Sequence, residues 1–360
     1  MNIAITHPGK DGIRFSAEII ANYIKRLGHF VSILSDSVNM DLFGDYNCDV
    51  HYDILMVSVL TSRDVFALPK KIKEYRKIAN KIIVGGLASR QLSKNSLKYI
   101  DAVVYGNIFS EKNAKIAISS SGFVTLPVEK SMPDFPISVT IKNKEKYYIL
   151  KKTECPNMCK YCCGPTGNLS LSDDEVIRIA KKLNRPVNIY TPDGDISEYL
   201  YTTLKKLKIA LNNRNYTPDA VRTITNSGYN GRVNTGIEGL SRKMRSSIGR
   251  SIDDDLWKYL LDRGATHFYL ICGLPGEEWC DYEEMLSDLA SAKKGHTLTL
   301  TPLEWSPYWM FGDNTAQDIT WAFSKKFCDL LKKTSSSAKW TRKIETHRNI
   351  ERMNGSCPFL

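Results

Sequence analysis

The sequence predicts an α/β protein with two domains, each built around a largely parallel sheet. The chain has 360 residues, which exceeds the size that one hydrophobic core normally serves. Short apolar runs rich in β-branched residues alternate with helical segments in both halves. Hydrophobic residues make up 42% and charged residues 25%, as in a soluble globular protein, and no apolar run reaches the roughly 18 residues of a membrane helix.

Residues 1–110 are expected to form a doubly wound parallel sheet of the Rossmann type. Helical spacing brings the apolar residues of Ala17–Leu27 onto one face, and Gly28 follows as a typical helix stop. Strands that alternate with helices favour parallel pairing, with ligands at the carboxyl ends of the strands. The predicted strands are Asn2–Ile5, Phe30–Leu34, Ile54–Leu60, Lys81–Val84 and Ala102–Tyr105.

Residues 111–146 are expected to link the two domains, because they contain a serine-rich stretch ending at Gly122 and the proline-spaced Met132–Pro136. Residues 147–311 then repeat a pattern of strand and helix, which predicts a barrel or a partial barrel. The predicted strands are Tyr147–Leu150, Val187–Tyr190, Arg222–Thr225, Arg232–Gly236, His267–Ile271 and Thr297–Leu300. The predicted helices are Asp173–Leu183, Ile252–Arg263 and Tyr282–Lys293.

Three cysteines follow the first of these strands in the spacing CxxxCxxC: Cys155, Cys159 and Cys162. Three thiolates from one loop can hold three corners of a [4Fe-4S] cluster, which leaves one iron without a protein ligand. A structural zinc site is the main rival, but zinc normally takes four ligands and no second pair of cysteines is present. The neighbouring Cys163 fits a small packing residue better than a further ligand.

The cysteine loop resembles the signature of the radical S-adenosylmethionine (SAM) superfamily, and Tyr161 before the third cysteine also fits that pattern. The resemblance implies a partial (β/α)6 barrel with a [4Fe-4S] cluster whose open iron is chelated by SAM. It further implies an electron donor of the flavodoxin or ferredoxin type. One electron would split SAM into methionine and a 5'-deoxyadenosyl radical.

Four further segments resemble those with which the superfamily binds SAM. Asp195 stands in a TPDGD segment in place of the usual GGE, where an acid meets the methionyl ammonium. Glu238 corresponds to the carboxylate that accepts hydrogen bonds from the ribose hydroxyls. Arg250, chosen over Arg245, corresponds to the planar donor for the SAM carboxylate. Gly273 opens a segment that lies against adenine through backbone contacts.

The first domain resembles the cobalamin-binding domains that precede many radical SAM cores. Ser58 and Leu60 match an SxL motif after one predicted strand, and Gly85 and Gly86 match a GG motif after the next. The histidine motif that ligates cobalt in some of these domains is missing after the first strand, where the chain has Thr6–Gly9. Cobalamin binding and a domain that binds nothing therefore both stay open.

The remaining features bear on the substrate. The net charge of +11 can mark a nucleic-acid partner, although the basic residues are scattered along the chain. Aromatic residues gather at Trp305–Phe311, where they could stack a planar substrate or pack in the core. Residues 312–360 are expected to form a helix and a basic tail that offers no chemistry.

These observations favour a cytoplasmic radical SAM enzyme, because the cluster and the reduced thiols suit a reducing compartment. Methyl transfer that depends on cobalamin is the leading reaction. The alternative is a cobalamin-free enzyme that modifies a nucleic-acid base or nucleotide. A hypothesis of a different class is a non-catalytic α/β binding protein stabilised by a metal. No membrane partner is expected, and the sequence does not identify the substrate.

Overall fold

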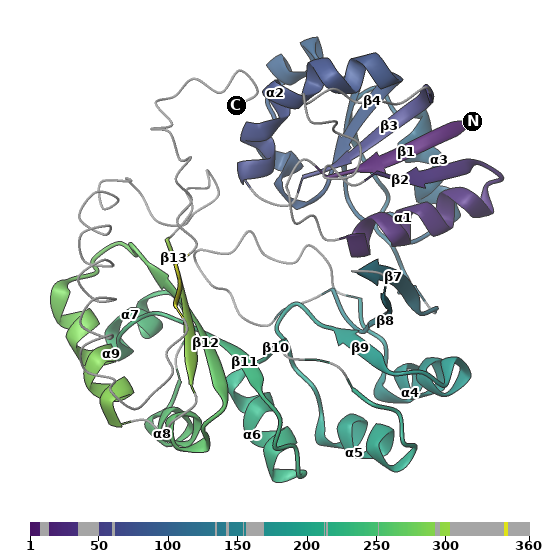
Figure 1. The fold of residues 1–360 in the computed structure, drawn as a ribbon. Coiled ribbons are helices and arrows are strands. Elements are labelled where there is room, and N and C mark those ends of the chain that lie inside the picture. The colour runs from purple at the N-terminus through teal and green to yellow at the C-terminus, as the bar shows by residue number, and fades with distance from the viewer. Residues whose placement is uncertain are drawn as a thin grey trace. The chain divides into compact units, whose positions relative to one another are not determined.

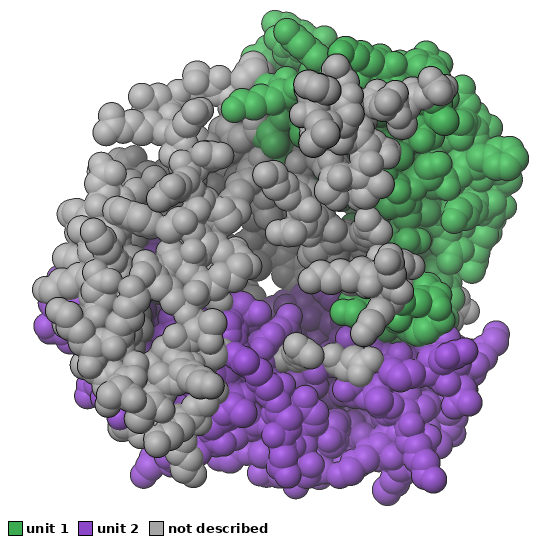
Figure 2. All heavy atoms as spheres, in the orientation of Figure 1, with its two compact units in different colours: residues 1–152, 166–171, 351–360 green, residues 153–165, 172–350 purple. Residues whose placement is uncertain are grey.

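The chain folds into two compact units (Figures 1 and 2). Unit 1 consists mainly of Met1–Lys152, and unit 2 mainly of Ser172–Ile350. The structure is a computed structural model. It describes residues 1–7, 14–34, 50–59, 62–133, 135–141, 144–153, 155, 169–211, 213, 215–250, 252–291, 296–302 and 342–344.

Unit 1 contains a parallel sheet of six strands in the order β2-β1-β3-β4-β5-β6. The strands are β1 (Asn2–Thr6), β2 (Phe30–Ile33), β3 (Tyr52–Ser58), β4 (Ala79–Gly85), β5 (Ala102–Tyr105) and β6 (Gly122–Thr125). The chain runs outward from β1 to β2 on one side, and from β3 through β6 on the other. The sheet order therefore reverses between β1 and β3, and in such sheets this point is where ligands bind.

Helices connect these strands: α1 (Arg14–Arg26), α2 (Ser62–Ile78) and α3 (Glu111–Ser119). Two short 3₁₀ helices, Leu87–Gln91 and Lys94–Lys98, lie between β4 and β5. Helix α2 packs against β4 and the first 3₁₀ helix, while α1 contacts α3. A cluster of buried apolar residues fills the space between α2 and the sheet, and Leu55, Leu68 and Ile82 in it are 0% exposed. The predicted doubly wound sheet is thus observed as a six-stranded parallel sheet.

The predicted linker is largely part of unit 1. Helix α3 starts where the Ser110 side chain accepts a hydrogen bond from the Asn113 amide, and β6 pairs with β5. Strands β7 (Ile137–Ile141) and β8 (Lys144–Leu150) then form an antiparallel hairpin. The serine-rich stretch therefore marks a turn between α3 and β6, where Gly122 has φ +70°, and not a domain boundary. The strand predicted at 147–150 also belongs to unit 1.

Unit 2 contains a parallel sheet in the order β10-β11-β12-β13-β14. Its strands are β10 (Asn215–Tyr216), β11 (Val233–Glu238), β12 (Thr266–Cys272), β13 (Thr297–Pro302) and β14 (Arg342–Ile344), and β9 (Val187–Tyr190) precedes them in the chain. The helices are α4 (Asp173–Leu183), α5 (Glu198–Lys206), α6 (Pro218–Asn226), α7 (Arg242–Ser247), α8 (Asp254–Arg263) and α9 (Trp279–Ser291).

Burial alternates along β11 and β12, as expected for strands with one covered face. Val233 and Phe268 are buried on the face that α6 and α8 cover, while Asn234 and Glu238 lie on the other face. Strands predicted near β9, β11, β12 and β13 are confirmed, and so is the helix predicted at 173–183. The closed six-stranded arrangement of a partial barrel stays a prediction.

One predicted strand is wrong, because residues 222–225 lie within α6. The β-branched residues there suggested a strand. The Thr217 side chain instead accepts a hydrogen bond from the Ala220 amide, and Pro218 occupies the first turn. Both features favour a helix start. Val221 and Ile224 are then buried on one helical face.

None of the helices in the described part of the chain combines the length and the apolar character that crossing a bilayer requires.

Candidate functional site

The carboxyl end of β11 brings Glu238 and Arg250 together. A Cβ placed on Gly236 would lie 2.2 Å from Glu238 Oε1 and 3.7 Å from Arg250 Nη2. Arg250 Nη2 also donates a hydrogen bond of 3.5 Å to the Gly236 carbonyl oxygen. An acid and a guanidinium group therefore flank the same glycine; both are side chains that the resemblance implies as SAM contacts.

Strain in the backbone accompanies this arrangement. Glu238 has φ +67°, a left-handed conformation that is costly for a residue with a Cβ, and the pairing of β11 with β12 shifts register between Gly236 and Glu238. Such strain persists only where the surrounding structure imposes it, and it concentrates at binding sites. The bulge therefore supports a functional role for the end of β11.

The other candidate arginine has a different role. Arg245 is 3% exposed, and its guanidinium carbon lies 4.9 Å from the centre of the Trp257 ring. Its Nη2 is 3.9 Å from Glu284 Oε1, and burial lowers the pKa of its guanidinium. Arg245 thus holds α7 onto α8 and α9. The half-buried Arg250 stands beside Glu238 instead.

The segment after β9 forms a tight turn with one buried acid and one exposed acid. Asp193 is 8% exposed, and its Oδ1 accepts a hydrogen bond of 3.1 Å from the Asp195 amide. Asp195, the predicted ligand, is exposed, and β9 is not a strand of the five-stranded sheet. Thr191 is a further candidate that the sequence analysis missed. Its Oγ1 is buried and has no hydrogen-bond partner within the described residues.

The end of β12 forms a turn whose first amide is already bonded. Gly273 has φ +86°, and its N–H donates to Glu277 Oε2 at 2.6 Å. The Tyr282 hydroxyl donates to the same oxygen at 2.8 Å. Burial raises the pKa of Glu277 to about 7, against the lowering effect of these two hydrogen bonds. Gly273 therefore offers a ligand its carbonyl group but not its amide.

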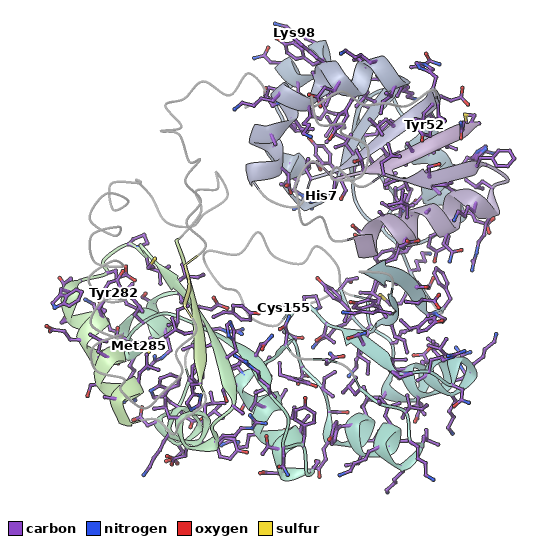
Figure 3. The ribbon with its side chains drawn as sticks, viewed as in Figure 1. His7, Tyr52, Lys98, Cys155, Tyr282 and Met285 are labelled. Carbon is purple, nitrogen blue, oxygen red and sulfur yellow. The ribbon has the colours of Figure 1, made fainter. Side chains whose placement is uncertain are left out.

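The cysteine loop is described only at its first cysteine. Cys155 is a free, half-buried cysteine at the start of the segment, and Figure 3 labels it. The other predicted residues of the loop lie outside the described residues: Cys159, Tyr161, Cys162 and Cys163. The same holds for the aromatic cluster at 305–311, the helix predicted in 312–360 and the basic tail apart from β14.

In unit 1 the ends of β3 and β4 lie in close contact. Ser58 pairs in register with Gly85, and the Val59 amide donates to the Gly85 carbonyl oxygen at 2.8 Å. Gly86 has φ +102°, and a Cβ there would lie 2.5 Å from the Val59 carbonyl oxygen. The structure thus brings together three of the four residues predicted to contact cobalamin. The fourth, Leu60, is outside the described residues.

A cavity of about 230 Å³ opens beside these residues. Its lining comes from α1, the loop after β5 and the carboxyl ends of β1, β3, β4 and β5. Most of the lining is apolar, while Ser16, Ser58, Ser89 and Arg90 contribute polar groups. Ser16 Oγ is buried, and no described residue forms a hydrogen bond with it. An apolar wall with a few polar groups at the reversal of strand order suits a largely apolar ligand group.

A histidine and a carboxylate also meet at this edge. His7 directly follows β1, and its Nε2 lies 3.3 Å from Asp64 Oδ2 in the first turn of α2 (Figure 3 labels His7). The Asp64 side chain is buried. Sequence analysis found no histidine motif here, because the partner is 57 residues away, and only the sheet brings the two together.

Comparisons with known proteins give limited guidance. No family model and no curated protein matches the chain. A radical SAM methyltransferase from Sphaerobacter thermophilus is similar in structure at 14% identity, over 62% of this chain and 72% of that chain, with a TM-score of 0.39. A variant of a spore photoproduct lyase matches at 10% identity over 94% and 84%, with a TM-score of 0.33. Another variant, solved with AdoMet and a dinucleoside spore photoproduct, has 12% identity and a TM-score of 0.23. Scores below 0.5 do not establish a shared fold.

We predict that Gly86→Ala destabilises unit 1 by about 2 kcal/mol or more, because the new Cβ meets backbone atoms and the left-handed φ disfavours alanine. Gly28→Ala is the matched control. Gly28 also has a positive φ, +81°, but a Cβ there meets nothing within 4 Å, so the expected loss is only about 1 kcal/mol. Urea denaturation followed by circular dichroism measures both. Equal losses would contradict the close approach of the two loops.

Proposed function

We propose that this protein is a radical SAM enzyme. The observation that carries the proposal is that Glu238 and Arg250 both approach Gly236 at the carboxyl end of a parallel strand, in a chain that also has the CxxxCxxC spacing. A [4Fe-4S] cluster with SAM on its open iron would supply a 5'-deoxyadenosyl radical, which abstracts hydrogen from an unactivated carbon of the substrate. A flavodoxin- or ferredoxin-type protein is the proposed electron donor.

The cysteines are proposed to hold the metal. Cys155, Cys159 and Cys162 would supply three thiolates, which is one fewer than the irons of the cluster. Cys155 is half-buried and free, which suits a thiolate ligand that must be shielded from water but must not be locked in the core. The remaining iron is then available to the amino and carboxylate groups of SAM.

The groups at the end of β11 match the chemistry of SAM. Glu238 offers an acceptor for the two ribose hydroxyls, and Arg250 offers a planar donor for the methionyl carboxylate. Both lie within 4 Å of one point at Gly236, and only a residue without a side chain leaves that point open. Asp195 is the proposed partner of the ammonium group, and the Thr191 hydroxyl, which no described residue bonds, is a second polar group after β9.

Methyl transfer with cobalamin is the proposed reaction, and the cavity in unit 1 supports it. The small residues Ser58, Gly85 and Gly86 line the cavity together with apolar side chains, so an apolar part of a larger ligand can approach the backbone closely. Cobalamin bound there would carry a methyl group derived from SAM to the substrate radical. The pair His7 and Asp64 lies at the same edge of the sheet.

The net charge of +11 favours a second candidate, a cobalamin-free enzyme that modifies a nucleic-acid base or nucleotide. That enzyme would bind RNA or DNA with an affinity that falls as salt rises, and it would retain no corrin. A non-catalytic metal-stabilised binding protein would form no 5'-deoxyadenosine at all.

We predict that anaerobic reconstitution loads four irons per chain, with a broad absorption band at about 400 nm. Dithionite reduction with SAM should then release 5'-deoxyadenosine. Cys159→Ala should lose the band, because a two-thiolate loop cannot hold the cluster firmly, whereas Cys163→Ala should keep it. Iron analysis and absorption spectroscopy measure loading. A loaded cluster in Cys159→Ala would contradict the ligand assignment, and a loaded wild type without deoxyadenosine would contradict the reaction.

We predict that Gly236→Ala weakens SAM binding about tenfold while the cluster stays loaded, because the added Cβ displaces the Glu238 carboxylate and one charged hydrogen bond is lost. Glu238→Gln should have a similar effect, since the amide is a weaker acceptor. Equilibrium dialysis with radiolabelled SAM measures the affinity, and iron content serves as the control. Unchanged affinity in both variants would remove the end of β11 from the SAM site.

We predict that protein expressed with hydroxocobalamin retains a corrin absorption spectrum after gel filtration. Ile20→Trp should abolish retention, because Ile20 lines the cavity and the larger ring fills it. Cluster loading should be unaffected in this variant. Failure of the wild type to retain any corrin, with salt-sensitive binding of RNA or DNA, would favour the nucleic-acid alternative.

A further inference from the structure

Glu277 is a partly buried carboxyl group that none of the proposed SAM contacts uses. It lies at the end of the turn that follows β12, four residues after Gly273. The Gly273 amide and the Tyr282 hydroxyl both donate to its Oε2, at 2.6 Å and 2.8 Å. Its own amide donates to the Leu274 carbonyl oxygen at 3.0 Å, which closes the turn. One side chain therefore joins the end of the strand to the start of α9.

The backbone beside Gly273 and the Tyr282 side chain are both held in place by packing. Leu274 is 0% exposed and packs with Met244 and Ile248 of the α7 region. Tyr282 is also 0% exposed, and its ring stacks on Trp279 with 5.6 Å between the centroids. Figure 3 labels Tyr282 on α9. A carboxylate that links two such fixed points defines the path of the backbone between them.

We propose that Glu277 is a positioning residue that sets the shape of the ligand-facing turn after β12, through its bond to the Gly273 amide. The inference rests on the proposed function for its ligand, the adenosine end of SAM. With the Gly273 amide turned to Glu277, the turn presents carbonyl groups and apolar atoms to the site. That surface suits an adenine ring, which has an amino group to donate and an apolar face to pack.

The hydrogen bond between the Gly273 amide and the Glu277 carboxyl group depends on the charge of Glu277. Burial raises the pKa of this carboxyl to about 7, so the group changes charge near neutral pH. The ionised form accepts charge-assisted hydrogen bonds, which are stronger than neutral ones, but the raised pKa means that the cost of burying the charge exceeds this gain. Oε1 is buried and has no hydrogen-bond partner in the part of the chain that is described, so a proton there loses no existing bond. Raising the pH through about 7 should therefore loosen the turn.

The surroundings of Glu277 make it the group that titrates. Asp281 on α9 is the charged neighbour that acts on it, and it raises the pKa as burial does. Tyr282 donates a hydrogen bond from the same helix and lowers the pKa. On the α7 side the contacts of the turn are the apolar Met244 and Ile248. The adjacent Glu278 is exposed, so it offers a matched control.

The test compares Glu277→Gln with Glu278→Gln in the full-length, cluster-loaded protein. We expect the SAM affinity of the wild type and of Glu278→Gln to fall about fivefold between about pH 6 and about pH 8.5, because the ionised Glu277 favours the open turn. Glu277→Gln should lose this component and bind with the affinity of the low-pH form. Tyr282→Phe should bind more weakly but keep the slope. Identical pH profiles in Glu277→Gln and Glu278→Gln would overturn the proposal.

Hydrogen–deuterium exchange separates this inference from the proposed function, because it needs no ligand. In the absence of SAM, peptides that cover Gly273–Glu277 should exchange about fivefold more slowly in Glu277→Gln than in Glu278→Gln at about pH 8, because the neutral amide carries no buried charge. Peptides from β11 serve as the internal control. Slower exchange without any SAM binding would mean that the proposed ligand is wrong and the positioning role is right. Equal exchange would overturn the positioning role itself.

Discussion

Parallel strand pairing is the constraint on which the candidate sites depend. Every pair in the six-stranded sheet of unit 1 and in the five-stranded sheet of unit 2 is parallel. Parallel pairing brings the carboxyl ends of neighbouring strands to one edge, although their residues are far apart in the sequence. Ser58 and Gly85 pair in this way in unit 1. In unit 2, Glu238 and Gly273 end neighbouring strands of the same sheet. Candidate functional residues therefore lie together at sheet edges, which helix and strand propensities alone do not identify.

Close approach at these edges requires glycine. Gly86 stands against the Val59 backbone, Gly194 against the Tyr216 backbone, and Gly236 beneath the Glu238 carboxylate. The first two are backbone contacts, so they fix how loops from different strands fit together. The third is a contact with a flexible side chain, which can move when a ligand binds. Gly86 and Gly194 thus allow backbone segments to pack closely, whereas Gly236 leaves space for a ligand.

The helices and strands could be predicted from the sequence where the residues that determine them are close together in the chain. Helix α4 shows a capping box, in which Ser172 and Glu175 satisfy each other's amides, and its bounds were predicted correctly. Helix α6 was not predicted, because the β-branched residues of 222–225 suggest a strand. The residues that favour a helix start, Thr217 and Pro218, lie before that stretch. Glu238 and Arg250 were predicted as SAM contacts only through a resemblance, and no local pattern predicted that both approach Gly236. The contact of His7 with Asp64 and the burial of Glu277 depend on tertiary packing, so no local pattern could reveal them.

Glu238 and Glu277 lie at the ends of the neighbouring strands β11 and β12, but their surroundings suit them to different roles. Glu277 is surrounded by the protein's own donors, the Gly273 amide and the Tyr282 hydroxyl, so it can organise backbone but has little left to offer a ligand. Glu238 is half-buried and stands beside a guanidinium group, on backbone held in a left-handed conformation. Burial raises the pKa of Glu277 and favours the neutral acid there. Of the two carboxyl groups, Glu238 is therefore the one that a ligand can reach, because Gly236 leaves space beside it at the end of β11.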